Sequence, residues 1–357
     1  MSKLNHHIND PRENNFVLDK KFISIHSEDR DIKKWPRSNN FEVQLPDAYK
    51  NVHSIRLADI SLPANYYTFS NYNQNTKMGF QVDFGTGRTP IDCTITIRDG
   101  FYQTDELVNT LKNKMNQAVS NVFNTTYNSF TVFYDHVSFK IWFGNDQNSF
   151  ILKFGEQMIY DDKDRGQQPV MWNNHSKWGL PSNIGFDKIN YQSEITNEDI
   201  RFDYLDDPPR FTNSNWLNAG GYYVESPNII SHLGEKNIYM EVDKYNSIDE
   251  LQPYSEATTN LFAKKGPYKT NQNDYGTNVN SAFAKIPIPI LPFGRVIDTI
   301  NGSLRNVMFF NPPLDKLCKL KFLFRYHDGR LVDFNTSAID FTLEINVLRN
   351  EVEQRSN

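Results

Sequence analysis

The chain has 357 residues, enough for one large or two ordinary domains that each bury a core of their own. Aromatic residues make up 14% of it, which argues against an intrinsically disordered chain, because such chains are poor in aromatics. The formal net charge is −5 and no strip of the sequence is dense in Lys or Arg, so the composition disfavours nucleic acid as a partner. No apolar run is long enough to span a bilayer.

The N-terminal part, residues 1–38, is predicted to be an arm followed by a lead-in strand. Up to about Lys21 the sequence is polar and has no hydrophobic period, so we expect an arm that is mobile until a partner orders it. Residues 22–25 then read as the first strand.

Residues 39–185 are predicted to form a first β-sandwich. Their apolar residues recur at every second position in short segments that end at Pro, Gly or Asp, which is the pattern of half-buried strands. The clearest of these segments are residues 41–45, 52–57, 79–84, 94–98, 130–134 and 137–143. The last two are expected to pair as a hairpin that turns at Asp135 and His136.

One helix is predicted inside this sandwich, at about residues 104–120. Thr104 is a candidate N-cap, and two acidic residues follow it at the positive end of the helix dipole. The helix places a stripe of apolar residues on one face, namely Leu107, Leu111, Met115 and Val119.

Residues 186–350 are predicted to form a second β-sandwich, followed by a polar tail at 351–357. The region 161–183 before it reads as a loop and a candidate boundary. A long polar loop at 252–281 interrupts the second sandwich, and loops of this length are usually functional or ordered by a partner. Proline at alternate positions makes residues 286–292 an extended edge rather than a central strand.

The strongest period-two pattern lies between residues 317 and 348. Leu320, Phe322 and Phe324 alternate with other residues, and Phe341, Leu343 and Ile345 do the same. An Asp-Gly turn at 328–329 lies between the two runs, and residues 331–334 are expected to continue after it as a short strand. The whole region is predicted to form an antiparallel ribbon with one apolar face. Such a ribbon must pack on another sheet, which favours a β-sandwich.

The sequence contains no motif that predicts catalysis, a cofactor or a metal. It has no phosphate-binding glycine loop, no nucleophile elbow and no pair of histidines at metal-ligand spacing. The acidic run 161–166 lacks the ligand spacing of a calcium loop. Cys93 and Cys318 lie in or beside strand patterns and are expected to be free thiols. We therefore expect no enzyme, no cofactor and no metal site.

Aromatic residues in loop-like surroundings are the candidate interface residues. Aromatic side chains on loops often anchor a partner, although they can equally close the ends of a sandwich. The candidates are Trp35, Trp172, Trp178, Trp216, Tyr254, Phe262, Tyr268 and Tyr275.

Three patches of the sequence carry strand and turn patterns that are found together in one known family. The first runs through the strands of 22–63, with Asp29-Arg30-Asp31 and Trp35-Pro36 between them. The second is 95–104 with the helix that follows, and the third runs from Asn311-Pro312-Pro313 to 345. These patches resemble minor capsid proteins of the nucleocytoplasmic large DNA viruses, including those that infect algae. Residues 161–282 resemble nothing comparable.

The resemblance implies a jelly-roll structural protein in the capsid of a large icosahedral virion, above an inner membrane and assembled in the host cytoplasm. Its implied partners are the major capsid protein, other minor capsid proteins and the inner membrane surface or its proteins. Two other readings stay open. A glycan-binding or host-attachment sandwich would use exposed tryptophans, and a sandwich-fold hydrolase would need carboxylates that the fold brings together.

Overall fold

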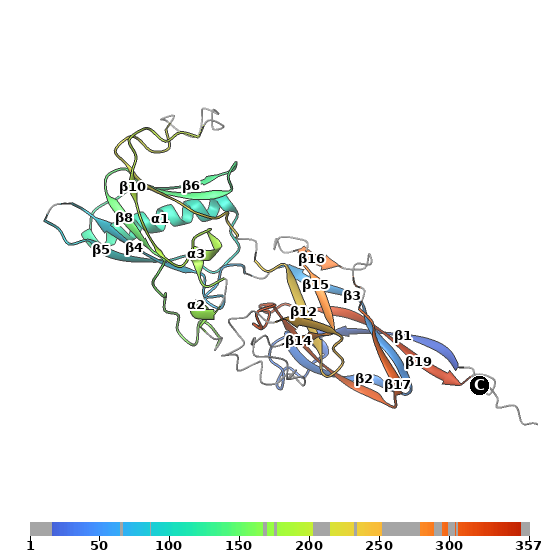
Figure 1. Cartoon of the computed structure of the whole chain (residues 1–357). Coiled ribbons are helices and arrows are strands. Elements are labelled where there is room, and N and C mark those ends of the chain that lie inside the picture. Colours follow the sequence, from blue (N-terminus) through green and yellow to red (C-terminus); the bar gives the residue numbers. More distant parts are fainter. Residues whose placement is uncertain are drawn as a thin grey trace, which may run out of the picture.

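The computed structural model describes residues 16–350 except 65–66, 86, 167–169, 175–176, 203–214, 232–233, 252–278, 289–294, 299–303 and 305. Two β-sandwiches lie end to end (Figure 1), and each encloses a hydrophobic core of its own. In Figure 1 the blue and the red strands share one body, whereas the cyan and green elements form the other. The two ends of the chain therefore build one sandwich together.

Two sheets form this first sandwich. One has the strand order β1-β19-β3-β16, with β17 also paired to β3, and the other has the order β15-β12-β18-β2. The strands of the first sheet are β1 (Phe16–His26), β19 (Asp340–Asn350), β3 (Val52–Ala64), β16 (Arg295–Asp298) and β17 (Met308–Leu314). Those of the second sheet are β15 (Ala284–Pro287), β12 (Asn237–Val242), β18 (Leu317–Arg325) and β2 (Asn40–Tyr49). A small hairpin of β13 (Ile248–Leu251) and β14 (Val279–Ala282) accompanies them.

The pairing follows a jelly roll. In chain order, the first strand pairs with the last (β1 with β19), and the second with the next to last (β2 with β18). The third, β3, pairs with both β16 and β17, and the fourth, β12, with β15. This is the order that results when one long antiparallel ribbon is rolled into two facing sheets. The mainly β fold class and the antiparallel sandwich predicted from the sequence are thus confirmed.

Alternation in the sequence sets the faces of these strands. Phe322 of β18 and Phe341 of β19 are fully or almost fully buried, and their ring centroids lie 4.8 Å apart across the sandwich. Phe41 of β2 adds a further ring 5.5 Å from that of Phe322. The apolar sides of the two sheets thus interlock at the centre of the first core.

The predicted ribbon of 317–348 is corrected by this arrangement. β18 pairs with β12 and β2, whereas β19 pairs with β1 and β3, so the two strands lie in opposite sheets. Residues 331–334 form no strand and contribute one isolated bridge, Arg325 to Leu331. A period of two determines which side chains are buried, but both facing sheets bury the same kind of side chain, so the period cannot choose the partner.

The second sandwich also has two four-stranded sheets. One has the order β5-β4-β8-β9 and the other the order β10-β11-β7-β6. The strands of the first are β4 (Lys77–Asp83), β5 (Ile91–Thr96), β8 (Ser149–Lys153) and β9 (Asn190–Gln192). Those of the second are β6 (Phe130–Asp135), β7 (Lys140–Asn145), β10 (Glu194–Ile195) and β11 (Tyr222–Glu225). The predicted hairpin of 130–143 is confirmed, with Asp135 opposite Lys140 at its turn.

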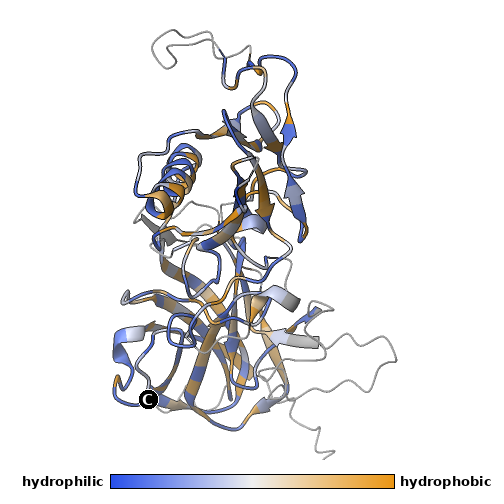
Figure 2. Cartoon of the chain, turned by 90° about the vertical axis from the view of Figure 1, so that its left-hand side faces the viewer, coloured by the Kyte–Doolittle hydropathy of each residue, from blue (hydrophilic) through white to orange (hydrophobic). Residues whose placement is uncertain are grey.

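The second sandwich carries the long helix α1 (Thr104–Phe123) and the short helices α2 (Met171–Asn174) and α3 (Leu180–Asn183). α1 packs on β5 and β6. Figure 2 shows it as a coil with hydrophilic and hydrophobic sides, beside the strands of its sandwich. The predicted stripe of Leu107, Leu111, Met115 and Val119 is buried in the second core. No helix within the described ranges is long and apolar enough to cross a membrane.

The start of α1 differs from the prediction by one residue. The N-cap is Gln103 rather than Thr104, and the backbone N–H of Gln103 donates to the Glu106 carboxylate at 3.1 Å. This is a capping box, in which Gln103 takes the place usually held by Ser or Thr. At the other end Asn124 adopts the left-handed conformation, with φ 51°, and ends the helix.

The structure divides the chain differently from the expected units 39–185 and 186–350. The first core draws on residues from Ile23 to Leu62 and again from Ile238 to Val347, while the second core lies between Phe69 and Val224. The second sandwich is therefore inserted between the third and fourth strands of the jelly roll. The region 161–183, a candidate boundary in the sequence, lies inside the inserted unit.

The predicted arm and loops are partly described. Residues 16–21 belong to strand β1 and not to an arm, because each of them pairs with a residue of β19. Residues 1–15 and 351–357, and most of the 252–281 loop, lie outside the described residues, whereas Asn280 and Ser281 are in β14. β15 is the outermost strand of its sheet, which confirms the edge predicted near residue 286.

Leu111→Asp tests the packing of α1. A charge placed at this fully buried position has no partner, so we expect the free energy of unfolding to fall by about 3–5 kcal/mol. Asn113→Asp introduces the same residue on the exposed side of the same helix and should leave stability within about 0.5 kcal/mol of the parent. Chemical denaturation measures both, and equal stabilities for the two variants would contradict the packing described here.

Candidate interaction surfaces

The joint between the two sandwiches is built on one buried cation. Arg330 lies in the turn after β18 and is 4% exposed. Its guanidinium donates to Asp328 at 2.7 Å, to Glu235 at 2.9 Å and to the side-chain oxygen of Asn73 at 2.7 Å. Asn73 belongs to the inserted unit and the other three residues to the jelly roll or its connector, so one side chain ties the two units together.

Further contacts surround this tie. The Tyr72 hydroxyl of the inserted unit donates to the backbone oxygen of Leu331 at 3.0 Å, and Lys177 pairs with Glu235 at 3.0 Å. Burial and the nearby Asp333 carboxylate raise the pKa of Tyr72 to about 12, so its hydroxyl keeps its proton and stays a donor. The joint is therefore polar, and Arg330 within it is almost fully shielded from bulk solvent.

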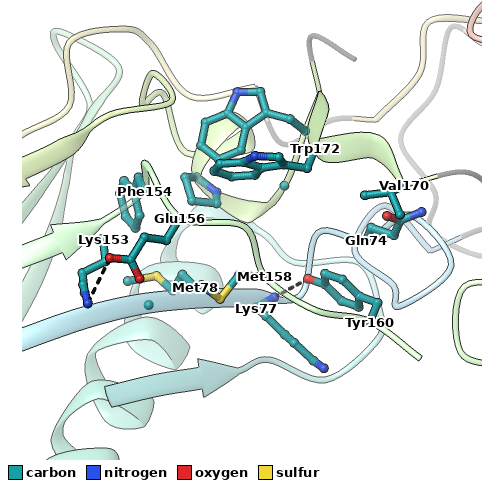
Figure 3. A pocket seen from close by; sticks show the side chains of 14 residues that line it. Gln74, Lys77, Met78, Lys153, Phe154, Glu156, Met158, Tyr160, Val170 and Trp172 are labelled. Carbon is teal, nitrogen blue, oxygen red and sulfur yellow. Dashed lines mark hydrogen bonds and ion pairs between the residues drawn. The ribbon is translucent and has the colours of Figure 1, made fainter. Parts of the chain in front are cut away.

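Trp172 and Trp178, two of the predicted interface residues, line a pocket of the inserted unit. Their rings meet edge to face with centroids 4.9 Å apart, and the Lys188 ammonium lies 4.8 Å from the Trp172 ring. In Figure 3 Trp172 lies on the opposite side of the pocket from Met78 and Met158. The free volume is about 10 Å³, room for about one water. Trp178 is 9% exposed, so this pair fills the unit's own packing and leaves no space for a ligand ring.

Trp216 packs on the outer face of the sheet that contains β7. Its ring lies 6.0 Å from that of Trp142 and 5.9 Å from that of Phe202. A Cβ atom added at Gly144 would lie 2.9 Å from the Trp216 ring, so the glycine permits this close approach. Trp216 is partly exposed within an aromatic cluster of its own unit.

Trp35 lies against the first core and is held between two cations. The Lys34 and Lys321 ammonium groups lie 5.3 Å and 5.0 Å from its ring. It remains partly exposed, and its role as an interface residue stays a prediction. The remaining four candidates, Tyr254, Phe262, Tyr268 and Tyr275, lie outside the described residues.

The most exposed aromatic side chains of the jelly roll lie elsewhere, on the outer face of the sheet β1-β19-β3. Phe16, Leu18 and Phe22 alternate along β1 and are 57%, 45% and 62% exposed, and Phe309 of β17 is 64% exposed. The register places Lys20, Asn346, Ser54 and Phe309 in one row across the sheet, so all of these side chains share one face. We call this face, with Phe16, Leu18, Phe22 and Phe309, the outer apolar face.

A charged cluster lies in the middle of the outer apolar face. The Glu344 carboxylate is 4% exposed and accepts hydrogen bonds from Arg56 at 2.7 Å and from Asn346 at 3.1 Å, with Lys20 at 3.8 Å. Burial opposes the charged form of Glu344, but these bonds and the two cations together hold its pKa below the usual value of 4.5. Protein interfaces are enriched in aromatic side chains and arginine, and this face presents both around one buried, paired carboxylate.

The sequence contains a signal for the outer apolar face, although the candidate interface residues were chosen among aromatic residues in loops. Residues 16–25 are apolar on both sides of the strand, with Phe16, Leu18 and Phe22 on one side and Ile23 and Ile25 on the other. A strand at the edge of a sandwich needs only one apolar side, so the second side points to a partner. Aromatic residues in strands can thus mark an interface as well as aromatic residues in loops.

The described residues offer little to a metal ion. No group of three or more His, Cys, Asp or Glu side chains within the described ranges is arranged to hold one. Cys93 and Cys318 are both free; Cys93 is buried in the second core and Cys318 is partly exposed. Burial and the neighbouring Asp92 raise the pKa of the Cys93 thiol.

Two solved structures are similar to this chain over most of its length, at low sequence identity. No family model and no curated protein matches the chain. A chain in the cryo-EM structure of the Sputnik virophage is similar, at 12% identity and a TM-score of 0.40, over 92% of this chain and 98% of that chain. The mavirus penton protein is similar at 10% identity and a TM-score of 0.41, over 93% of this chain and 99% of that chain.

Arg330→Met tests the tie between the units. The substitution removes the central cation from a buried charge network that includes the carboxylates of Asp328 and Glu235, so we expect a loss of about 3–5 kcal/mol. Arg349→Met is the matched control, because Arg349 pairs with Asp19 at 2.9 Å with 47% of its side chain exposed, and such pairs contribute about 0–1 kcal/mol. Denaturant titration of both variants measures the difference, and a small loss at Arg330 would show that the joint does not depend on it.

Glu344→Gln tests the charged cluster through pH. Because the pKa of folded Glu344 is lowered, its stabilisation is present above the unfolded value of 4.5 and is lost as the pH falls through the folded value. We expect the variant to be less stable than the parent by about 1.5–3 kcal/mol at pH 7, and the gap to close under acid. The exposed Glu28→Gln is the control, and at pH 7 it should leave stability within about 0.5 kcal/mol of the parent. A gap that stays constant down to acid pH would contradict the assignment.

Proposed function

We propose that the chain is a structural minor capsid protein of a large icosahedral DNA virus, and that it binds neighbouring capsid proteins through the outer apolar face. In this role it stabilises the shell above the inner membrane. The role is structural and needs no catalytic activity. Its location is the virion, after assembly in the host cytoplasm.

The fold supports the proposal through the parts of the sequence that resemble minor capsid proteins. The strands of 22–63 and those of 311–345 lie far apart along the chain, yet they form the two facing sheets of one jelly roll. The third similar patch, at 95–104 and the helix after it, lies in the inserted unit. The resemblance therefore covers strands that pair with one another in both sheets of one sandwich, whereas β12, β15 and β16 of that sandwich lie outside the similar patches.

The observation that carries the proposal is the outer apolar face itself. Four large apolar side chains, each at least 45% exposed, occupy one side of a sheet whose other side is the core. Exposed large apolar side chains that gather on one face of a soluble protein, with polar side chains among them, mark a site of contact with a partner. A capsid subunit, which is surrounded by other proteins, has partners to cover such a face.

The edge of the same sheet adds a second means of contact. β1 is the outermost strand, and β19 is its one strand partner in the described part of the chain. Along the eleven residues of β1, the N–H and C=O groups of every second residue point to the free edge, where an extended segment of a neighbour can pair. The major capsid protein and other minor capsid proteins are the partners that this proposal names.

Crosslinking of purified particles tests the proposed role. Lys20 and Lys21 lie on β1 with 59% and 43% of their side chains exposed, so an amine-reactive crosslinker can reach both. We expect the chain among the particle proteins and crosslinks from these two lysines to other capsid proteins. Absence of the chain from particles would refute the structural role. Crosslinks confined to the inserted unit would refute the proposal that the outer apolar face binds the neighbouring proteins.

Phe22→Asp combined with Phe309→Asp tests the same face by mutation. Both side chains are exposed, so the isolated chain should fold as before, whereas a partner would have to bury two unpaired charges. We expect incorporation into particles to fall at least about tenfold. Phe139→Asp is the matched control, because Phe139 is 55% exposed at the β6–β7 turn of the inserted unit and has a positive φ that Asp tolerates. Equal incorporation of both variants into particles would contradict the proposal that the outer apolar face binds a partner there.

A further inference from the structure

A second cavity lies where the two units meet, apart from the outer apolar face. It has a volume of about 220 Å³. The jelly roll contributes Arg37 and Asp333 to its wall, and the inserted unit contributes Tyr67, Asp99, Lys163 and Asp164. Pockets for drug-sized ligands have volumes of about 300–1,000 Å³, so this cavity is the size for one small ring.

Several polar side chains in this wall are available to bind a ligand. In the described part of the chain, the side chains of Arg37, Lys163 and Asp164 make no hydrogen bond or ion pair. Among the described residues, the Asp99 carboxylate accepts only two long hydrogen bonds of 3.3 Å, both from the backbone N–H of Asn71. These groups offer both donors and acceptors to a ligand, and their two positive and three negative charges nearly cancel once Asp333 is included.

One wall is aromatic and accessible. Tyr67 is 48% exposed, although it follows directly on the connector between the units, and its backbone oxygen accepts a hydrogen bond from Asn73 at 3.1 Å. Asn73 is itself fixed by Arg330 at 2.7 Å. The position of the ring is thus coupled to the tie that orders the joint.

A smaller cavity of about 30 Å³ adjoins the first and shares Tyr67 and Asn73 with it. The hydroxyl oxygen of Thr68, a residue that is 6% exposed, is buried there without a hydrogen-bond partner among the described residues. A buried hydroxyl without a partner is costly, and a volume of about 30 Å³ holds one water or one hydroxyl group. The site therefore has an unfilled position for a polar group.

We infer that this cavity at the joint binds a neutral carbohydrate and accommodates one of its sugar rings. A sugar hydroxyl donates one hydrogen bond and accepts others, which suits a wall that mixes Asp carboxylates with Arg37 and Lys163. A strongly charged ligand, whether an anion or a cation, would be repelled by the side chains of like charge in this wall. The apolar face of the ring can lie against Tyr67, because an aromatic ring has an apolar surface and a polar tip.

This inference does not rest on the proposed capsid role. A capsid protein can lack the sugar site, and a sugar-binding protein can act outside a capsid. A negative result for one of these two properties therefore leaves the other untouched. Particle crosslinking reports on the capsid role, whereas sugar binding by the isolated chain reports on this cavity. The sugar site also differs from the one that exposed tryptophans would make, because Trp172 and Trp178 leave no room for a ring.

The test uses the purified 357-residue chain and a set of neutral monosaccharides as their methyl glycosides, with sialic acid and a sulfated sugar for comparison. Ligand-observed NMR and calorimetry measure binding. We expect at least one neutral sugar to bind at millimolar concentration or better, and Tyr67→Ala and Asp164→Asn each to weaken it at least about tenfold. Both residues are exposed, so neither change should unfold the chain.

Phe309→Ala is the matched control, since it removes an exposed ring of similar size from the outer apolar face and should leave sugar binding unchanged. The inference is overturned if no neutral sugar binds, or if only the charged sugars bind. It is equally overturned if a neutral sugar binds with the same affinity to the parent, Tyr67→Ala and Asp164→Asn.

Discussion

The register between β1 and β19 closes the jelly roll, and the other features of the structure depend on that closure. Phe16 lies opposite Asn350 and His26 opposite Asp340, so the strands that come first and last along the described chain run side by side. Every strand between them must therefore fold back in nested order. The inserted unit roughly doubles the length of the closed loop, and each doubling costs only about 0.6 kcal/mol of closure entropy. A whole second sandwich fits between β3 and β12 for this reason.

The sequence contained enough to predict the faces of the strands but not their partners. Phe322 and Phe341 recur at every second residue with other apolar side chains, and both are buried as predicted. Their strands nevertheless belong to different sheets. Burial depends on which side a residue occupies, a local property, whereas pairing depends on contacts across some 300 residues that no local pattern records. The division into units failed for the same reason, because the first core joins segments from both sides of the insertion.

The candidate sites show a similar split. Helix α1 was predictable because capping, charge and the Leu111 stripe all act within one segment. The tryptophans were noticed for their size and their surroundings, yet Trp178 is buried and Trp172 packs against it. Size alone does not separate an anchor from a core residue. Arg330 had no distinguishing mark in the sequence, since its importance comes from Asn73 and Glu235, which lie far from it along the chain.

The insertion also has a consequence for synthesis. Chains emerge from the ribosome in order, and domains generally fold as units as they appear. The inserted unit is complete by about Val224, while β1 must wait for β19. During that interval the apolar residues on both sides of β1 are uncovered, and so are β2 and β3, whose partners β18 and β19 are also still to come. The half-made jelly roll is thus the stage at which nascent chains are most open to aggregation and to chaperones, and the inserted unit, already folded, separates its two halves.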